Sequence, residues 1–222
     1  MLKRLLFLCV VLFLDTGLMG ALREEASLEE LRKKGLPVES LEDAGISKED
    51  MKLYLIFWDD LKCFPVAGRI NARTERFSYE NSWHEKRNYG GERLHEGCDI
   101  FPQTSKTDYY PVISITDGEI ENIGWLPLGG FRIGIRSSGG GYFYYAHLSS
   151  YAENFQVGDE IEAGEILGFL GDTGYGEEGT TGKFPPHLHL GIYVSAKEQE
   201  EYPLNPYPVL QFLQERQKNF FY

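Results

Sequence analysis

From Cys63 onward the chain consists of short apolar runs separated by turn signals, and this texture restricts the possible fold more than any other feature. The runs are rich in Val, Ile, Tyr and Phe, which favour pleated strands. Asp117-Gly118 and the Ser-Gly run 137–141 interrupt them as hairpin turns do. The predicted strands are Val112–Thr116, Glu119–Ile123, Phe131–Arg136, Tyr142–His147, Glu165–Leu170 and His187–Val194. The region therefore predicts a mainly β domain, an antiparallel sheet or a sandwich-like arrangement.

The segments that flank this region have helical patterns. Ser27-Leu28-Glu29-Glu30 resembles a capping box, and Ser47 begins a second short helix before residue 62. Asn205-Pro206 begins a terminal helix within residues 204–217. The predicted organisation is a helical extension over 22–62, then one domain over 63–222 that ends in a helix.

Residues 1–21 have the layout of a secretory signal. Lys3 and Arg4 precede an apolar run over residues 5–14, and small residues follow. The run is shorter than the roughly twenty residues that span a bilayer. No small-x-small cleavage pair stands out, so an uncleaved anchor that tethers the protein to a membrane is the alternative. Both interpretations place the body of the protein outside the cytoplasm, secreted or on the extracellular face of the membrane.

The cysteines carry a prediction about redox state. Cys9 lies in the apolar run and leaves with it if the segment is cleaved. Cys63 and Cys98 remain as an even pair in an oxidising compartment, where disulfides persist. We expect a Cys63–Cys98 disulfide; two buried thiols are the alternative.

Length and charge narrow the class of protein. A chain of 222 residues holds one sizeable core, and we expect a monomer. The net charge of −12 argues against nucleic acid as a partner, because neutralising phosphates requires clustered Lys and Arg.

Four of the five histidines fall into three short motifs. In His187-Leu188-His189-Leu190 the period of a strand puts both imidazoles on one face and both leucines on the other. Such a pair suits a metal site, or one ligand beside one proton-transfer group, or two histidines held by ordinary hydrogen bonds. His95 and Asp99 are four residues apart, a weak signal alone, and Gly97 between them favours a loop that enters a strand. His147 ends an aromatic run and alone would suit a core position.

A long segment over residues 171–186 contains many glycines and no hydrophobic period. A loop of this length inside a compact domain is usually functional or disordered. Since it leads directly into His187, we expect it to form a wall of a substrate groove.

Taken together, these motifs resemble those of the lysostaphin-type (LytM-like) zinc metallo-endopeptidases that act on peptidoglycan. The resemblance covers roughly residues 64–208 and includes flanking sequence as well as the histidines. The flanking matches are Thr116-Asp117-Gly118-Glu119-Ile120, Tyr145-Ala146-His147-Leu148-Ser149, Val157-Gly158-Asp159-Glu160-Ile161, residues 168–174 and Pro186 to Leu190.

The resemblance implies a role for each motif residue. It implies one Zn²⁺ per chain, held by His95, Asp99 and His189, and catalytic roles for His147 and His187. It also implies peptidoglycan peptides as substrate and a location at the cell wall. Zinc would lower the pKa of its water toward about 7 and polarise the scissile carbonyl, and histidine suits proton transfer near neutral pH.

Two departures and two alternatives accompany this prediction. Cys98 stands where the family usually has an aliphatic residue, and Lys183-Phe184-Pro185 replaces a shorter run, which leaves substrate choice open.

His84 matches no motif, so we expect it on the groove rim or the surface. A non-catalytic scaffold on the same fold is the main alternative, although no motif residue is missing. A lipoyl- or biotinyl-carrier domain is a weaker one, because no suitable lysine lies near the matching turn.

Overall fold

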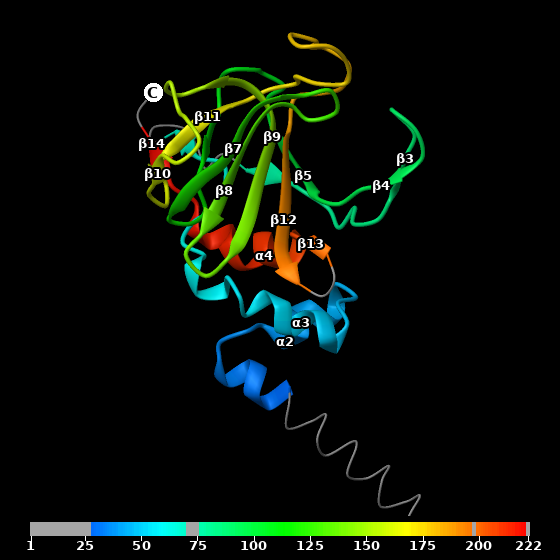
Figure 1. Ribbon diagram of the computed structural model, residues 1–222, viewed down its shortest axis with the longest axis vertical. Coiled ribbons are helices and arrows are strands. Elements are labelled where there is room, and N and C mark those ends of the chain that lie inside the picture. The colour runs from blue at the N-terminus through cyan, green and yellow to red at the C-terminus, as the bar shows by residue number, and fades with distance from the viewer. Residues whose placement is uncertain (1–27, 70–75, 197–198, 221–222) are drawn as a thin grey trace, which may run out of the picture. The chain divides into compact units, whose positions relative to one another are not determined.

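The computed structural model describes residues 28–69, 76–196 and 199–220 (Figure 1). The predicted signal segment, including Cys9, lies outside these residues. Within the described ranges, no helix combines the length and the apolar character that crossing a membrane requires. The chain divides into two compact units between Leu55 and Ile56, each described here by itself. The predicted domain boundary at residues 62 and 63 stays a prediction.

The first unit is helical over its described part. Residues 28–33 are helical and are followed by α2 (Val38–Asp43) and α3 (Lys48–Tyr54). Ser47 caps α3 as predicted, because its Oγ accepts a hydrogen bond from the Asp50 backbone N–H at 3.0 Å. The short helical extension predicted from the sequence is confirmed.

The second unit is built on a largely antiparallel sheet (Figure 1). Its main strands, given by neighbours across the sheet, are β10 (Glu160–Ile161), β7 (Gly118–Leu126), β8 (Gly130–Ser137), β9 (Gly141–Tyr151), β12 (Leu188–Ala196), β5 (Cys98–Pro102) and β2 (Phe77–Ser78). Further strands extend it: β11 (Ile166–Leu170) pairs with β9 and with β6 (Pro111–Ile113), and β13 (Gln199–Leu204) pairs with β12. The mainly β fold class is confirmed.

Smaller elements complete this unit. The hairpin β3 (Lys86–Arg87) and β4 (Arg93–Leu94) forms a separate two-stranded sheet, and β1 (Gly68–Arg69) pairs in parallel with β14 (Asn219–Phe220). Short 3₁₀ turns cover Trp58–Asp60 and Gln214–Arg216. The C-terminal helix α4 (Tyr207–Leu213) begins as predicted after Asn205, whose side chain accepts a hydrogen bond from the Tyr207 N–H at 3.0 Å.

The core follows the alternation of the central strands. The Phe143 and Tyr145 side chains of β9 are fully buried, as are Leu188 and Leu190 of β12. The Tyr145 hydroxyl satisfies its hydrogen bonding by accepting from the Ile115 backbone N–H at 3.0 Å. Because Leu188 and Leu190 face the core, His187 and His189 face the opposite side of β12, as the sequence predicts.

A β-bulge in β9 changes which residues face the core. The pairs Ile133↔Tyr145 and Phe131↔Leu148 leave one extra residue on β9, and His147 there adopts a φ of 64°. As a result Tyr145 and Leu148, three residues apart, are both buried in the core. The strand therefore does not end at His147, as predicted, but continues to Tyr151.

The predicted Cys63–Cys98 disulfide is wrong, because both residues are buried free thiols. The Cys63 thiol donates to the Ser114 carbonyl oxygen at 3.2 Å, and the Cys98 thiol donates to the Glu80 carbonyl oxygen at 3.3 Å. The segment around Cys63 runs alongside β6 and is hydrogen-bonded to it. Cys98, in contrast, lies in β5 between β12 and β2. Sheet topology thus gives each thiol a different environment.

Candidate metal centre

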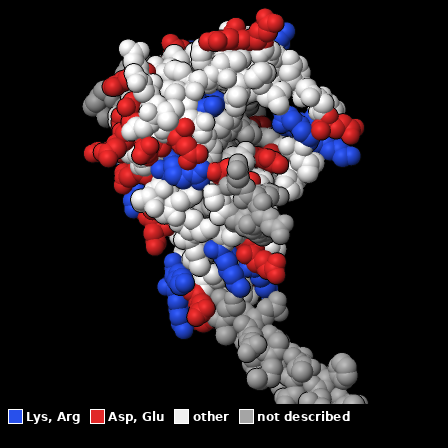
Figure 2. Space-filling view, in the orientation of Figure 1, with Lys and Arg blue, Asp and Glu red and all other residues white. Residues whose placement is uncertain are grey.

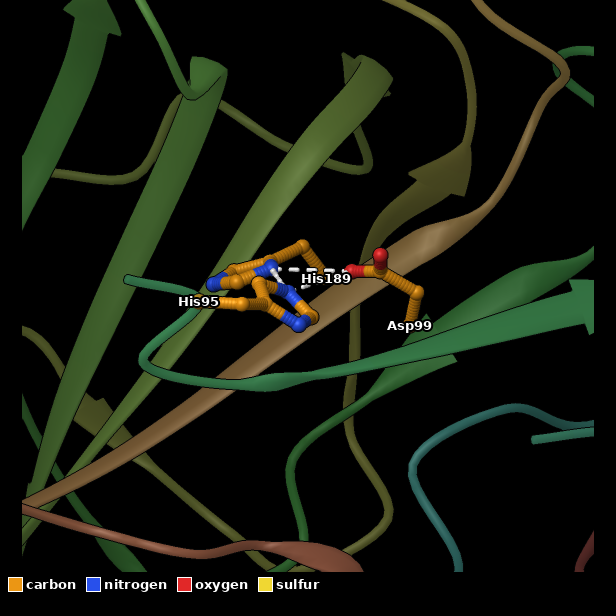
Figure 3. A group of neighbouring side chains, drawn as sticks. All are labelled: His95, Asp99 and His189. Atoms are coloured by element: carbon orange, nitrogen blue, oxygen red, sulfur yellow. Dashed lines mark hydrogen bonds and ion pairs between the residues drawn. The ribbon is translucent and has the colours of Figure 1, made fainter. Parts of the chain in front are cut away.

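Three side chains converge from two neighbouring strands and the loop before one of them (Figure 3). His189 of β12 lies directly opposite Asp99 of β5 in the antiparallel register. Directly opposed residues have Cβ atoms only about 5 Å apart, so their side chains meet on the same face. His95 reaches the same point from the chain that enters β5. The register of one strand pair thus brings the predicted ligand residues together.

The donor atoms of this group are spaced as ligands of one ion. His95 Nε2 lies 3.0 Å from His189 Nδ1 and 3.1 Å from Asp99 Oδ1, and His189 Nδ1 lies 2.9 Å from Asp99 Oδ1. Ligands at about 2.0–2.1 Å around a tetrahedral zinc are about 3.3 Å apart. Two imidazole nitrogens and one carboxylate oxygen at nearly this spacing fit zinc, and together these residues form a group that could hold a metal ion.

Gly97 makes this approach possible. A Cβ placed on Gly97 would lie 2.3 Å from His189 Cε1 and 2.9 Å from the Leu190 carbonyl oxygen. The sequence indicated only that Gly97 favours a loop. The structure supplies a stronger reason, since any other residue there would collide with the His189 ring.

A second layer of residues orients the group. His95 Nδ1 lies 3.1 Å from the Ser82 carbonyl oxygen, so donation to that carbonyl leaves Nε2 free to bind a metal. Arg87 donates from Nη2 to Asp99 Oδ2 at 3.1 Å, which leaves Asp99 Oδ1 directed at the histidines. Arg87 is a residue of this site that the sequence analysis did not identify.

Asp99 is held as a carboxylate. Burial raises the pKa of Asp99. Hydrogen bonds from His189 and His95 lower it, as do the charges of His189 and His187, and together these effects outweigh burial. The result is a pKa well below the ordinary range. An ionised carboxylate is the form that ligates a divalent cation.

The two remaining motif histidines stand beside this group. The His147 and His187 ring centroids are 4.8 Å apart, and His187 Nε2 lies 3.7 Å from Asp99 Oδ1. His147 Nδ1 lies 2.8 Å from the Thr173 carbonyl oxygen, and His187 Nδ1 lies 2.8 Å from the Pro185 carbonyl oxygen. Each Nδ1–H therefore donates to the backbone, and each Nε2 is left as the free nitrogen.

Burial keeps these two rings neutral. Burial lowers the pKa of His147 well below its ordinary value, and the neighbouring His187 and His189 lower it further. Burial also lowers the pKa of His187, although the Asp99 charge opposes the shift. A neutral imidazole with a free Nε2 can accept a proton.

A groove of about 840 Å³ contains all five motif residues. Four exposed large apolar side chains line it: Leu94, Phe101, Leu126 and Leu128. Apolar walls around a few convergent polar groups are typical of a ligand site. His84, in contrast, is exposed and stacks on Trp83, in agreement with the predicted surface position.

The loop over residues 171–186 forms part of this groove, as expected from its position before His187. Phe184 packs on both proton-transfer candidates, with ring centroids 4.5 Å from His147 and 5.0 Å from His187. Tyr175 lies 6.1 Å from His147 and stacks on Tyr89 of the β3–β4 hairpin at 4.1 Å. The sequence marked this loop but contained no signal for these ring contacts.

Comparison with known proteins agrees with this geometry. The chain is 41% identical over 169 residues to an L-Ala–D-Glu endopeptidase of Bacillus subtilis, covering 75% of this chain and 49% of the relative. It is 38% identical over 105 residues to lysostaphin of Staphylococcus simulans, covering 46% of this chain and 19% of that protein. The chain thus spans about half the length, or less, of these curated relatives.

One solved structure aligns with a larger share of this chain than either of these relatives does. It is that of a LytM-type protein of Ruminococcus gnavus, a candidate glycyl-glycine endopeptidase. The chain is 47% identical to it with a TM-score of 0.71, over 79% of this chain and 70% of the other. The sequence also matches Peptidase family M23 over residues 93–206, a range that contains all five motif residues. On this match over more than half of its length, and on a relative of the same fold, the chain belongs to peptidase family M23.

Proposed function

We propose that this protein is a zinc-dependent endopeptidase that hydrolyses peptide bonds in bacterial peptidoglycan. One observation carries the proposal: three metal-donor atoms lie beside two neutral imidazoles with free Nε2 atoms, in one groove. This combination is what metal-assisted hydrolysis of an amide requires.

The proposed ligands of one zinc ion per chain are His95 Nε2, Asp99 Oδ1 and His189 Nδ1. A zinc ion held there would polarise the scissile carbonyl and lower the pKa of an attacking water. Three protein ligands leave a fourth position open, which distinguishes catalytic zinc sites from structural ones.

His147 and His187 are the proposed proton-transfer residues. Because both rings are neutral and present Nε2, either can accept the proton of the attacking water and return it to the departing amine. Phe184 packs on both rings, so it limits their rotation and helps to exclude water.

The names of the relatives support peptidoglycan peptides as the substrate class. The Bacillus relative is an L-Ala–D-Glu endopeptidase, and ALE-1 of Staphylococcus capitis is a glycyl-glycine endopeptidase. Action on such peptides would take place at the cell wall, in agreement with the predicted signal or tether in residues 1–21. We propose that the protein works there as a monomer.

The test is digestion of purified peptidoglycan by the zinc-loaded protein, with the released fragments identified by mass spectrometry. We expect new amino termini at one type of peptide bond, and their loss when zinc is removed by a chelator. A protein that binds zinc and peptidoglycan but releases no fragments would instead support the scaffold alternative.

A further inference from the structure

Arg93 is a cation in the groove that the proposed mechanism does not use. It lies in β4 and lines the groove together with Arg87. The chain as a whole carries a net charge of −12, and Figure 2 shows acidic side chains in several groups on the visible face and basic ones in fewer groups, one of them at the right edge where Figure 1 shows the β3–β4 hairpin. A guanidinium in the groove of an acidic protein therefore marks a local preference for negative charge.

The two groove arginines differ in their partners. Arg87 is paired with Asp99 at 3.1 Å and with Glu85 at 3.7 Å. Arg93 donates from Nη2 to the Tyr175 hydroxyl at 3.2 Å, and its Nε is buried without a partner. Among the residues that the structure describes, no carboxylate pairs with Arg93. Since a guanidinium has five N–H donors, most of those of Arg93 remain for a ligand.

The Arg93 side chain is held near the reacting groups. It precedes His95 by two residues, so their Cα atoms are at most about 7 Å apart. Its partner Tyr175 contacts the His147 ring and is fixed by stacking on Tyr89. The Trp125 indole N–H also holds this loop, by donating to the Gly176 carbonyl oxygen at 3.3 Å. Arg93 is therefore a positioned cation and not a freely moving surface side chain.

We propose that Arg93 is a specificity-determining residue that binds a substrate carboxylate close to the scissile bond. This inference rests on the proposed function and narrows it to acidic peptides. An L-Ala–D-Glu linkage, the bond in the name of the Bacillus relative, carries a free carboxylate beside it, whereas a glycyl-glycine bond within a bridge carries none. Arginine recognises carboxylates in a planar, two-donor geometry that lysine cannot reproduce.

The charges that line the groove are compatible with an anionic ligand. Its two carboxylates are Asp99, which is engaged by Arg87 and the ligand histidines, and Glu96, which is exposed. Neither pairs with Arg93. A substrate carboxylate at Arg93 would thus meet an uncompensated cation.

The experiment compares two synthetic peptides that differ in one group. Both contain an L-Ala–D-Glu bond, and in one the free carboxylate of D-Glu is replaced by a carboxamide. We expect the full chain with zinc to hydrolyse the carboxylate peptide with a kcat/KM about 10- to 100-fold higher, the range for a hydrogen bond to a charged group. The Arg93→Gln variant should lose this preference and keep its zinc, and Arg93→Lys should recover only part of it.

Lys86→Gln is the matched control, because Lys86 is an exposed cation on the same hairpin that does not line the groove. It should keep the full preference. Equal rates on the two peptides by the unmodified protein, or an unchanged preference in Arg93→Gln, would overturn the inference. Calorimetric binding of both peptides to the unmodified protein tests it separately from catalysis. If neither peptide is hydrolysed, but the carboxylate form binds more tightly and Arg93→Gln removes that difference, the role of Arg93 in binding stands. Digestion of whole peptidoglycan then tests the proposed function separately.

Discussion

At the scale of single residues, the chemistry depends on which ring nitrogen of each histidine is free. His95, His147 and His187 each place Nδ1 at a backbone carbonyl, so Nε2 faces the groove. His189 is turned the other way and directs Nδ1 at Asp99. This difference lets His189 join the metal-donor group while His187, two residues away on the same strand face, remains available for proton transfer.

The proposed ligands and the proposed proton-transfer residues should have different effects on zinc binding when they are replaced. Alanine at His95, Asp99 or His189 should abolish zinc binding and activity together. Alanine at His147 or His187 should leave zinc bound and reduce turnover by about 10²- to 10⁴-fold, the range for loss of a positioned acid or base. Zinc content and peptidoglycan turnover of the five variants provide the measurement. Loss of zinc in His187→Ala with retention in His189→Ala would reverse the assignment.

The two thiols should be free but unreactive in the folded protein. Burial raises the pKa of Cys63 to about 11 and that of Cys98 to about 12, so almost no thiolate forms at neutral pH. Alkylation at pH 8 should modify neither cysteine in the native protein, and both after denaturation without reductant. If neither Cys63 nor Cys98 is alkylated in the denatured, unreduced protein, the two residues form a disulfide.

At the scale of elements, the site depends on the contact between β5 and β12. Their register sets Asp99 against His189, and it requires the chain before β5 to pass close to the His189 ring at Gly97. The bulge in β9 then turns the His147 side chain toward the same groove. The backbone N–H of His147 donates to the Gly129 carbonyl oxygen at 2.8 Å. A non-glycine residue in left-handed conformation costs about 1–3 kcal/mol, so neighbouring contacts must hold it in place.

Gly97→Ala should weaken zinc binding through this contact. The added Cβ would force the His189 ring or the Leu190 carbonyl to move. We expect the variant to fold with lower stability and to bind zinc at least tenfold more weakly, as measured by competition with a chromogenic chelator. Gly168→Ala is the control, because its Cβ would collide with the Ser150 carbonyl oxygen in β9 and not with a motif residue. It should lose stability but keep its zinc affinity; equal affinities in the two variants would contradict the role of Gly97.

At the scale of the whole molecule, the buried histidines link folding to pH. The pKa values of His147 and His187 in the fold lie below their ordinary value of 6.5, so the folded state resists their protonation. Their contribution to stability is therefore complete above pH 6.5 and is lost as the pH falls through the lowered pKa values. Asp99, whose pKa is also lowered, loses its contribution only below its ordinary value of 3.8.

We therefore expect the metal-free protein to lose stability as the pH falls below 6.5. The free energy of unfolding should fall with a slope of up to about 1.4 kcal/mol per pH unit for each proton that the unfolded chain binds in excess. Urea denaturation at several pH values measures this slope. His147→Gln should make it shallower, and an unchanged slope in that variant would mean that His147 is not the group responsible.

Zinc removal should also lower the stability of the whole chain. An ion that binds only the folded state contributes about 2.7 kcal/mol at one hundred times its dissociation constant. We expect the melting temperature to fall in excess chelator and to recover when zinc is added. In the Asp99→Asn variant, zinc should cause a much smaller rise. A melting temperature that does not respond to zinc in the unmodified protein would argue against the metal site.

The sequence by itself determined the strand-rich domain and the common face of His187 and His189. Alternation along β12 separates His187 and His189 from the buried Leu188 and Leu190, and this follows from the two-residue period of any strand. Short turn signals likewise located the six predicted strands, which correspond to β6, β7, β8, β9, β11 and β12, because glycine and aspartate act on the backbone locally. That these residues, up to 94 positions apart in the chain, gather in one site was implied by the resemblance to the lysostaphin-type family, because the strand period alone does not predict it.

Only the tertiary structure decided the remaining features. The bulge that turns His147, the separation of Cys63 from Cys98, and the placing of Arg87 and Arg93 in the groove all depend on contacts between distant segments. A local sequence pattern does not predict such contacts, because they arise from strand order and from the packing of loops. The sequence thus specifies which groups face the groove from each strand, and the packed fold decides which of them act together.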